Sequence, residues 1–173
     1  MTTAPGQVLI IRHGEKPGDP SIESAADSPD LSTQGCERAA SLAIYVPATF
    51  GKPDFLFATQ ASKNSNRPVE TITPLAQVLG LTIDDKHADD DYRAVATDVL
   101  THPKYAGKLV LICWHHGKIP ELATALGGVP PTTHWKSDVF DRVWKIDYPD
   151  AGATTGLPVA DIPQMLMYGD TAT

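Results

Sequence analysis

The sequence predicts an α/β protein, a three-layer α/β/α sandwich built on a mainly parallel sheet. Short apolar runs alternate along the chain with segments that carry apolar residues at helical spacing. The runs lack the polar–apolar alternation of half-exposed strands, which indicates strands buried on both faces. Strands of this kind, separated by helices, form crossover units whose helices cover both faces of the sheet.

Length and composition fit one compact domain, which we place over residues 1–173. Hydrophobic residues make up 42% of the chain and charged residues 20%, which is enough for a globular core. The formal net charge of −7 argues against general binding to nucleic acid or anionic membranes. It still allows a small cationic pocket, because such a pocket needs only local charge.

The predicted compartment is the cytoplasm. The amino-terminal sequence has no basic segment followed by a long apolar run, so we expect neither a secretory signal nor a membrane span. Cys36 and Cys113 are expected to be reduced thiols, as is usual in that compartment.

The first elements are a buried strand over 7–11 and a helix that follows a loop. The loop, 16–30, is rich in Pro, Asp and Ser. Ser32 suits the N-cap of the helix, and Pro47 is expected to end it.

A second strand over 54–59 leads through a polar loop to the next helix. Pro68 suits its first turn, and the helix should end near Gly80 after an interruption at Pro74. Residues 82–91 are acidic and expected to be exposed. The later elements are a helix over 92–100, a strand over 108–114, a helix over 118–128 and a strand over 139–147. No firm structure is predicted from Pro149 onward.

Polar residues follow two of the predicted strands where each strand ends. Arg12, His13 and Gly14 follow the first, and His115, His116 and Gly117 follow the strand over 108–114. The loop after the second strand supplies Arg67. Because the carboxyl ends of parallel strands meet at one sheet edge, we expect two arginines and the histidines to converge there.

Such a site suits phosphoryl transfer. Arginine matches phosphate oxygens with its planar fork, and a neutral imidazole is a competent nucleophile. The sequence has neither a Gly-rich Walker-type loop nor an obvious magnesium site. We therefore expect metal-independent chemistry without a cofactor, in which arginines stabilise the transferring charge.

Four segments in order, LIIRHGEKP, LSTQGCERA, an arginine before a helix and an apolar strand ending in HHG, resemble the histidine phosphatase superfamily. The likeness covers about residues 7–127 and is to the small branch, in particular to short members with RHGEKP. It implies a phosphoglycerate mutase-like fold and phosphatase activity. A small phosphorylated substrate or a phosphoprotein would be the partner.

The resemblance also implies a role for each matching residue. His13 would be the nucleophile that becomes phosphohistidine, with Arg12 and Arg67 binding the phosphoryl oxygens. His116, directly before Gly, would stabilise the transferring group. His115 is expected to lie beside the site, where it could contact substrate.

The general acid is expected among neighbouring aspartates. The resemblance places it after the second-arginine helix, where Asp91 is preferred because it lies closest to the next helix. Asp90, also a candidate substrate contact, and Asp89 stay open, as does a solvated acidic loop without a catalytic role. His87 with these aspartates lacks the ligand spacing of known metal sites.

Two further residues extend the motif to RHGEKP. Glu15 is expected at the substrate site, where it would orient a neighbouring arginine, and Lys16 would add positive charge at the rim. The second helix motif is interpreted structurally, with Gly35 allowing a close helix–strand approach and Arg38 as a surface charge.

Three other functions stay open. A phosphomutase would return the phosphoryl group to substrate, although the short segment from Arg67 to His116 leaves little room for a lid. A silent phosphate-binding or interaction module could keep the fold, and the pocket could also serve another anion.

Overall fold

The computed structural model describes residues 3–18, 28–150 and 153–172. Part of the predicted loop over 16–30, residues 19–27, lies outside the described residues. The strands are β1 Gln7–Arg12, β2 Phe55–Ala58, β3 Ile83–Asp84, β4 Leu109–Trp114, β5 Gly128–Val129, β6 Arg142–Asp147 and β7 Leu157–Pro163. The α-helices are α1 Thr33–Phe50, α2 Arg67–Leu79, α3 Tyr92–Thr101 and α4 Ile119–Ala125, with the 3-10 turns η1 Asp89–Asp91 and η2 Pro103–Tyr105.

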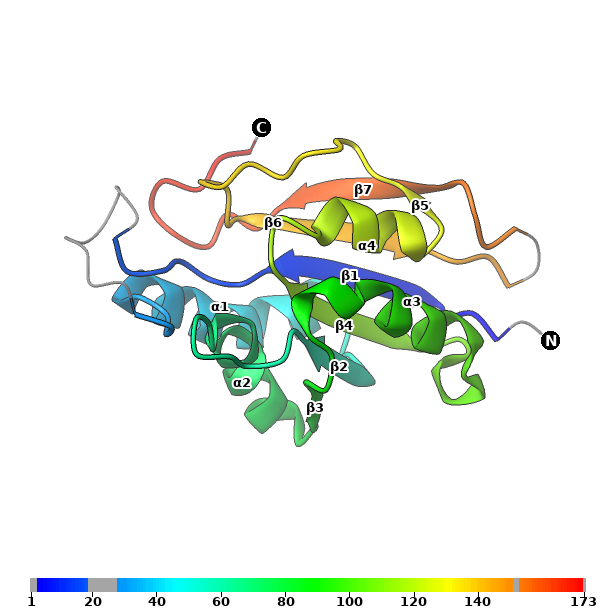
Figure 1. The fold of residues 1–173 in the computed structure, drawn as a ribbon, viewed down its shortest axis with the longest axis horizontal. Coiled ribbons are helices and arrows are strands. Elements are labelled where there is room, and N and C mark those ends of the chain that lie inside the picture. Colours follow the sequence, from blue (N-terminus) through cyan, green and yellow to red (C-terminus); the bar gives the residue numbers. More distant parts are fainter. Residues whose placement is uncertain (1–2, 19–27, 151–152, 173) are drawn as a thin grey trace.

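The strands form one mixed sheet in the order β3-β2-β4-β1-β6-β7-β5 (Figure 1). Strand β1 runs parallel to β4, and β4 runs parallel to β2. Strand β6 is antiparallel to both of its neighbours, β1 and β7. Among the described strands it is therefore the one that is reversed, and the predicted mainly parallel sheet is confirmed.

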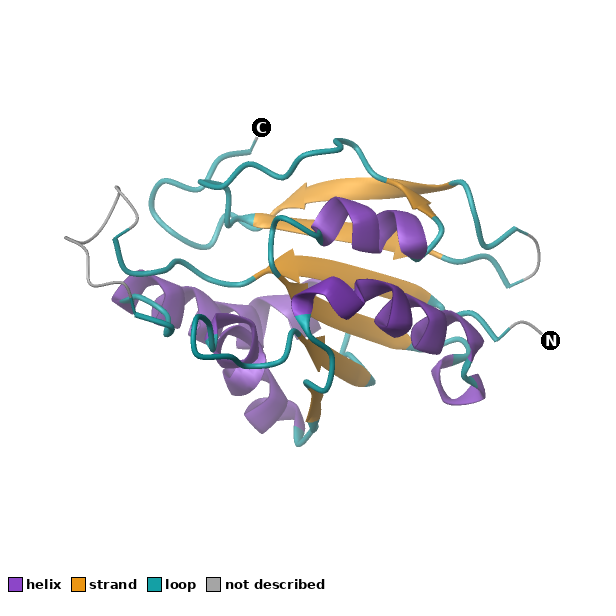
Figure 2. Ribbon diagram, viewed as in Figure 1, coloured by secondary structure: helices purple, strands orange, loops and turns teal. Residues whose placement is uncertain are grey.

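Two apolar clusters lie on opposite faces of the sheet. Alternate residues of β1 point to different sides, with Val8 and Ile10 packed with α3 and α4, and Leu9 and Ile11 packed with α1 and α2. Figure 2 shows α3 and α4 together in front of the strands. The three-layer sandwich predicted from the doubly buried strands is thus present.

Both prolines predicted to end or interrupt helices lie inside them. Helix α1 continues past Pro47 to Phe50, and α2 is continuous through Pro74. Proline fixes a φ close to the helical value but removes one backbone hydrogen bond. In α1 the rings of Tyr45 and Phe50, before and after Pro47, lie 5.8 Å apart and contact each other across the proline. The ends near Ser32 and Gly80 were predicted correctly.

Three strands among the described residues were not predicted. Strand β5 begins at Gly128, the last residue of the predicted helix over 118–128, because α4 already ends at Ala125. Strand β3 has only two residues and lies within the acidic segment 82–91. Strand β7 lies in the tail for which no firm structure was expected, and it pairs with β6 from Val159 to Pro163. The tail therefore contributes to the sheet next to the strand that borders β1.

Candidate active site

His13 follows β1 at the carboxyl edge of the sheet, beside the end of β4. Arg12 and Trp114 are paired across these parallel strands, and the His13 amide donates to the Trp114 carbonyl at 3.3 Å. The His13 side chain is almost fully buried. The expectation that the RHG and HHG segments follow neighbouring parallel strands is confirmed.

The hydrogen bond of the His13 ring fixes its tautomer. Nδ1 lies 2.7 Å from the Gly14 carbonyl oxygen. A carbonyl oxygen only accepts, so Nδ1 carries the hydrogen and Nε2 keeps its lone pair in the neutral ring. Burial and the charge of Arg12 hold the pKa of His13 well below its usual range. The ring is therefore neutral at physiological pH, with Nε2 available for nucleophilic attack.

The backbone after His13 is attached to helix α2. The Gly14 amide donates to Thr71 Oγ1 at 2.8 Å, and the Thr71 hydroxyl donates to the Arg67 carbonyl at 2.7 Å. Thr71 is fully buried and links the loop after His13 to the turn that carries Arg67. Nothing in the sequence distinguished this threonine from an ordinary helix residue.

Glycine is required where α1 meets this loop. A Cβ on Gly35 would collide with the Glu15 carbonyl oxygen, and a Cβ on Gly14 would lie 3.0 Å from the Gly35 carbonyl oxygen. The predicted close approach at Gly35 is confirmed. It brings the N-terminus of α1 against the residues that follow His13.

Arg12 is held by the segment before β6. Its Nη1 donates to the carbonyls of Ser137 at 2.7 Å and Val139 at 2.9 Å. The guanidinium carbon lies 3.6 Å from the centre of the Phe140 ring, a cation–π contact. Phe140 also faces the His13 ring edge-on, at 6.1 Å between centroids. This support for Arg12 has no signal in the sequence, because its residues lie more than 120 positions away.

Arg67 begins α2, directly before Pro68. Its Nη1 donates to the Ser28 carbonyl at 2.8 Å. The positive charge of Arg67 is among the causes that lower the pKa values of His13 and His115. Both predicted arginines therefore lie where their charge acts on the histidines.

His115 and His116 have different neighbours. The His115 ring is 5.2 Å from that of His13, edge-on at 71°. Burial and the charge of Arg67 lower the pKa of His115 to about 4. Burial and the charges of Arg12 and Lys16 lower the pKa of His116 to about 4. Its buried Nδ1 has no hydrogen-bond partner among the described residues.

The three candidate aspartates have different surroundings. Asp91 is exposed, and its Oδ2 accepts from the Ala88 amide at 3.3 Å, as a cap of the turn η1. Asp90 is exposed and pairs with Lys118 at 2.9 Å. Asp89 is half-buried, and its Oδ1 is buried without a hydrogen-bond partner among the described residues.

Asp89 also has a pKa that is shifted from the usual value of an aspartate. Burial, reinforced by the charge of Asp90, raises the pKa of Asp89 to about 6. The Trp114 indole donates to the Asp89 carbonyl oxygen at 3.2 Å, which attaches η1 to the end of β4. Asp89 therefore lies next to the strand end that carries His115 and His116.

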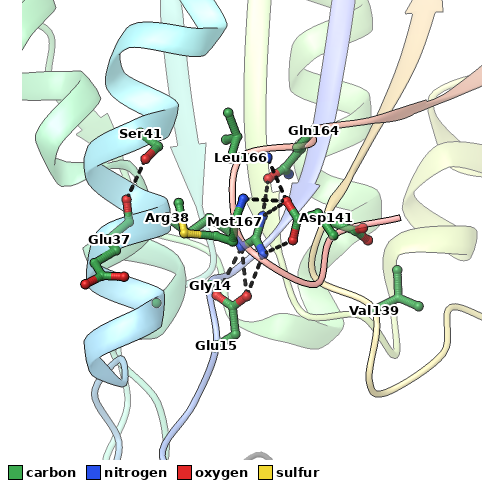
Figure 3. Close-up of polar contacts among 12 residues, drawn as sticks. Gly14, Glu15, Glu37, Arg38, Ser41, Val139, Asp141, Gln164, Leu166 and Met167 are labelled. Carbon is green, nitrogen blue, oxygen red and sulfur yellow. Dashed lines mark hydrogen bonds and ion pairs between the residues drawn. The ribbon is translucent and has the colours of Figure 1, made fainter. Parts of the chain in front are cut away.

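Arg38 is buried, and the expectation of a surface charge was wrong. Figure 3 shows its guanidinium between Glu15 and Gln164. Both Glu15 carboxylate oxygens accept from Arg38 Nε at 3.0 Å, and Asp170 pairs with its Nη2 at 2.7 Å. The predicted pairing of Glu15 with an arginine is present, and Arg38 engages both of its carboxylate oxygens. Lys16 is exposed, as a rim residue would be.

The described residues contain no group of three or more His, Cys, Asp or Glu side chains arranged to hold a metal ion. In the same part of the chain, no helix is long and apolar enough to cross a membrane.

Comparison with known proteins identifies the fold. No family model and no curated protein matches the sequence. The protein histidine phosphatase SixA in complex with tungstate is 17% identical, with a TM-score of 0.63 over 91% of this chain and 97% of SixA. The mycobacterial glucosyl-3-phosphoglycerate phosphatase in complex with VO3 is 16% identical, with a TM-score of 0.59 over 90% and 96% of the two chains. Phosphoglycerate mutase from Bacillus anthracis is 16% identical, with a TM-score of 0.54 over 92% and 94%.

The chain therefore has the phosphoglycerate mutase-like fold, the fold of the histidine phosphatases. At these identities the comparisons show the fold alone. The residues at the sheet edge must carry the argument about chemistry.

Proposed function

We propose that the protein is a metal-independent phosphatase that hydrolyses a phosphate monoester or phosphoramidate through a phosphohistidine on His13. The observation that carries this proposal is the His13 ring, which is buried, neutral and fixed with Nδ1–H on the Gly14 carbonyl. The charges of Arg12 and Arg67 act on the His13 ring, which supports a role for both arginines in neutralising a phosphoryl group beside Nε2. The phosphatases that share the fold support the same chemistry.

In the first step, Nε2 attacks phosphorus while the bond from phosphorus to the leaving oxygen or nitrogen breaks. The phosphohistidine ring is cationic, and its Nδ1–H stays on the Gly14 carbonyl. Arg12 and Arg67 stabilise the charge on the equatorial oxygens. The buried Nδ1 of His116 has no hydrogen-bond partner within the described part of the chain, and a phosphoryl oxygen would satisfy it if that nitrogen carries the hydrogen.

We assign the general acid to Asp89 in preference to Asp91. A carboxyl whose pKa is near 6 is partly protonated near neutral pH and can donate to the leaving atom. The Asp91 carboxylate caps its own turn and is exposed, and Asp90 is paired with Lys118. In the second step a water attacks phosphorus, the bond from phosphorus to Nε2 breaks, and phosphate leaves. The water's proton returns to Asp89.

His115 completes the wall beside the nucleophile. Its ring contacts that of His13 and lies under the influence of Arg67, so we place it against the phosphoryl group or its leaving atom. Lys16 supplies positive charge at the exposed rim, where it would attract an anionic substrate.

The test is turnover of p-nitrophenyl phosphate and phosphoramidate with and without EDTA. We expect activity that EDTA does not change and that His13→Ala abolishes. His102→Ala, which removes an exposed histidine at the end of α3, is the matched control and should keep full activity. Acid-labile, base-stable phosphate on the wild-type chain, absent from His13→Ala, would identify the intermediate. Failure to hydrolyse any phosphate ester or phosphoramidate would reject the proposal.

A phosphomutase is the second candidate because a phosphoglycerate mutase shares the fold. Incubation with phosphoglycerate separates the two functions. A phosphatase releases free phosphate, whereas a mutase interconverts the isomers with little release. Only the second outcome would favour the mutase.

A further inference from the structure

A buried ionic cluster connects the nucleophile loop to the segment after β7. Arg38 of α1 donates from Nη2 to Glu15 at 2.6 Å and to Asp170 at 2.7 Å, and from Nη1 to Gln164 Oε1 at 2.9 Å. The side chains of Arg38, Glu15 and Asp170 are at most 5% exposed. Figure 3 shows Gln164, Leu166 and Met167 of this segment beside the guanidinium.

Stability alone is a weak explanation for this cluster. Two carboxylates share one guanidinium, and the cost of removing buried charges from water often equals or exceeds their mutual attraction. A well-packed apolar group of similar volume would stabilise the fold about as well. The ionic cluster instead fixes the orientation of each carboxylate. The planar guanidinium donates its hydrogen bonds in fixed directions, so a bound carboxylate can take few orientations.

The direction of Glu15 bears on His13 through a single peptide unit. The Gly14 carbonyl and the Glu15 amide belong to the same planar group, so a rotation at Glu15 turns that carbonyl. The Gly14 carbonyl is the acceptor that holds the hydrogen on Nδ1 of His13. Glu15 is fixed at both ends, by Ser32 N donating to its carbonyl at 2.9 Å and by Arg38 at its carboxylate.

The segment that carries Asp170 is itself fixed in place. Asp170 Oδ2 accepts from the amides of Leu166 at 2.8 Å and Met167 at 3.0 Å, which closes the turn on itself. The Thr171 amide donates to Asp141 Oδ2 at 2.8 Å. Asp141 directly follows Phe140, the residue that stacks on Arg12. The Asp170 carboxylate is thus held in position independently of Arg38.

We propose that Asp170 is a positioning residue for the nucleophile, acting through Arg38 and Glu15 to hold the Gly14 carbonyl against His13 Nδ1. The segment 164–170 thereby selects the tautomer that leaves Nε2 free. The effect on turnover rests on the proposed phosphatase function, whereas the effect on the tautomer does not.

The experiment compares Asp170→Asn with the wild type in two measurements. Steady-state kinetics with p-nitrophenyl phosphate gives kcat and KM, and ¹⁵N NMR of histidine-labelled protein gives the His13 tautomer, assigned with His13→Gln. Loss of one charge-assisted contact should free the Gly14–Glu15 peptide and lower kcat about tenfold, with KM within about twofold of wild type. The His13 signals should change from one Nδ1–H tautomer to a mixture.

A matched control is Asp147→Asn. Asp147 also pairs with a cation, Lys145 at 2.7 Å, but it lies at the opposite edge of the sheet, beside the start of β1. Asp147→Asn should change neither kcat nor the tautomer of His13. Arg38→Lys, which keeps the charge but loses the fork, carries the test if Asp170→Asn fails to fold. It should give the same two changes.

Retention of wild-type kcat and a single His13 tautomer in a folded Asp170→Asn or Arg38→Lys protein would overturn the proposal. A fall in kcat with an unchanged tautomer would also overturn it, because Asp170 would then act by another route. A wild-type protein without phosphatase activity, in which Asp170→Asn still mixes the tautomers, would reject the proposed function and support the positioning role.

Discussion

Replacement of Asp89 by asparagine should stabilise the protein at neutral and alkaline pH. The pKa of Asp89 is raised from 3.8 to about 6, largely by burial. A carboxyl with a raised folded-state pKa favours the fold fully below pH 3.8, and that contribution is lost as pH rises through 6. Asparagine has a similar shape and stays neutral, so the variant avoids the cost of a half-buried charge above pH 6.

The size of the stabilisation follows from the shift in the pKa of Asp89. Two pH units correspond to at most about 3 kcal/mol, and because Asp89 is only half-buried, solvent screening reduces this to about 1–2 kcal/mol. For a chain of this length, the melting temperature at pH 8 should rise by about 2–8 °C. At pH 5 the gain should fall to about half, since the folded carboxyl is then mostly protonated.

The assay is thermal unfolding followed by circular dichroism at pH 5 and pH 8, with Asp85→Asn as the control. Asp85 is exposed in the same acidic segment, so its replacement should leave the pH dependence unchanged. The reasoning fails if Asp89→Asn is less stable than wild type at pH 8, or if its gain is equal at both pH values. In the same variant, kcat for esters of poorly leaving alcohols should fall about 10²–10⁴-fold. p-Nitrophenyl phosphate, whose leaving group departs as an anion, should be affected far less.

Three further changes should alter stability. Thr71→Val removes the acceptor of the buried Gly14 amide and should lower the free energy of unfolding in urea by about 1–3 kcal/mol. Thr71→Ser, which keeps the hydroxyl, should restore it. Ser32→Ala removes the side chain that caps α1 at Gly35 N and should lower the free energy of unfolding by about 1 kcal/mol in the same assay. A loss under a few tenths of a kcal/mol would contradict the role of Ser32 as a cap. Because burial lowers the pKa of His115 to about 4, stability should decrease as pH falls from 6.5 toward 4, where the unfolded histidine binds a proton that the folded one does not. His115→Asn should weaken that pH dependence in denaturant titrations at pH 7 and pH 5, and an unchanged slope would show that His115 is not its source.

The sheet core could be predicted because buried parallel strands are continuous apolar runs. Strand β4, with Val110 to Trp114 all buried, is such a run. Strand β7 could not be recognised in this way, since only Val159 among its residues is buried and two prolines lie within it. Its place in the sheet comes from pairing with β6, which is a tertiary contact that local pattern does not encode.

The candidate site likewise contains features that could be predicted from the sequence and features that could not. The positions of the histidines and arginines at strand and helix ends could be predicted, because those ends follow from local sequence patterns. Arg38 could not, because its surroundings depend on Asp170, which lies 132 residues later. The choice among Asp89, Asp90 and Asp91 depends on side-chain burial within one short turn, and consecutive residues of the same type give no sequence signal for that.

The attachment of Arg12 and Arg38 to distant segments has a consequence for the order in which the protein folds. Arg12 contacts Ser137 across 125 positions and Arg38 contacts Asp170 across 132. Contacts at such separation close large loops and form late in folding. During synthesis His13 leaves the ribosome long before the residues that support Arg12 and Arg38. Under the proposed function, hydrolytic activity should arise only after residue 170 has been made and β6 and β7 have joined the sheet. A nascent chain should therefore carry His13 in an inactive form.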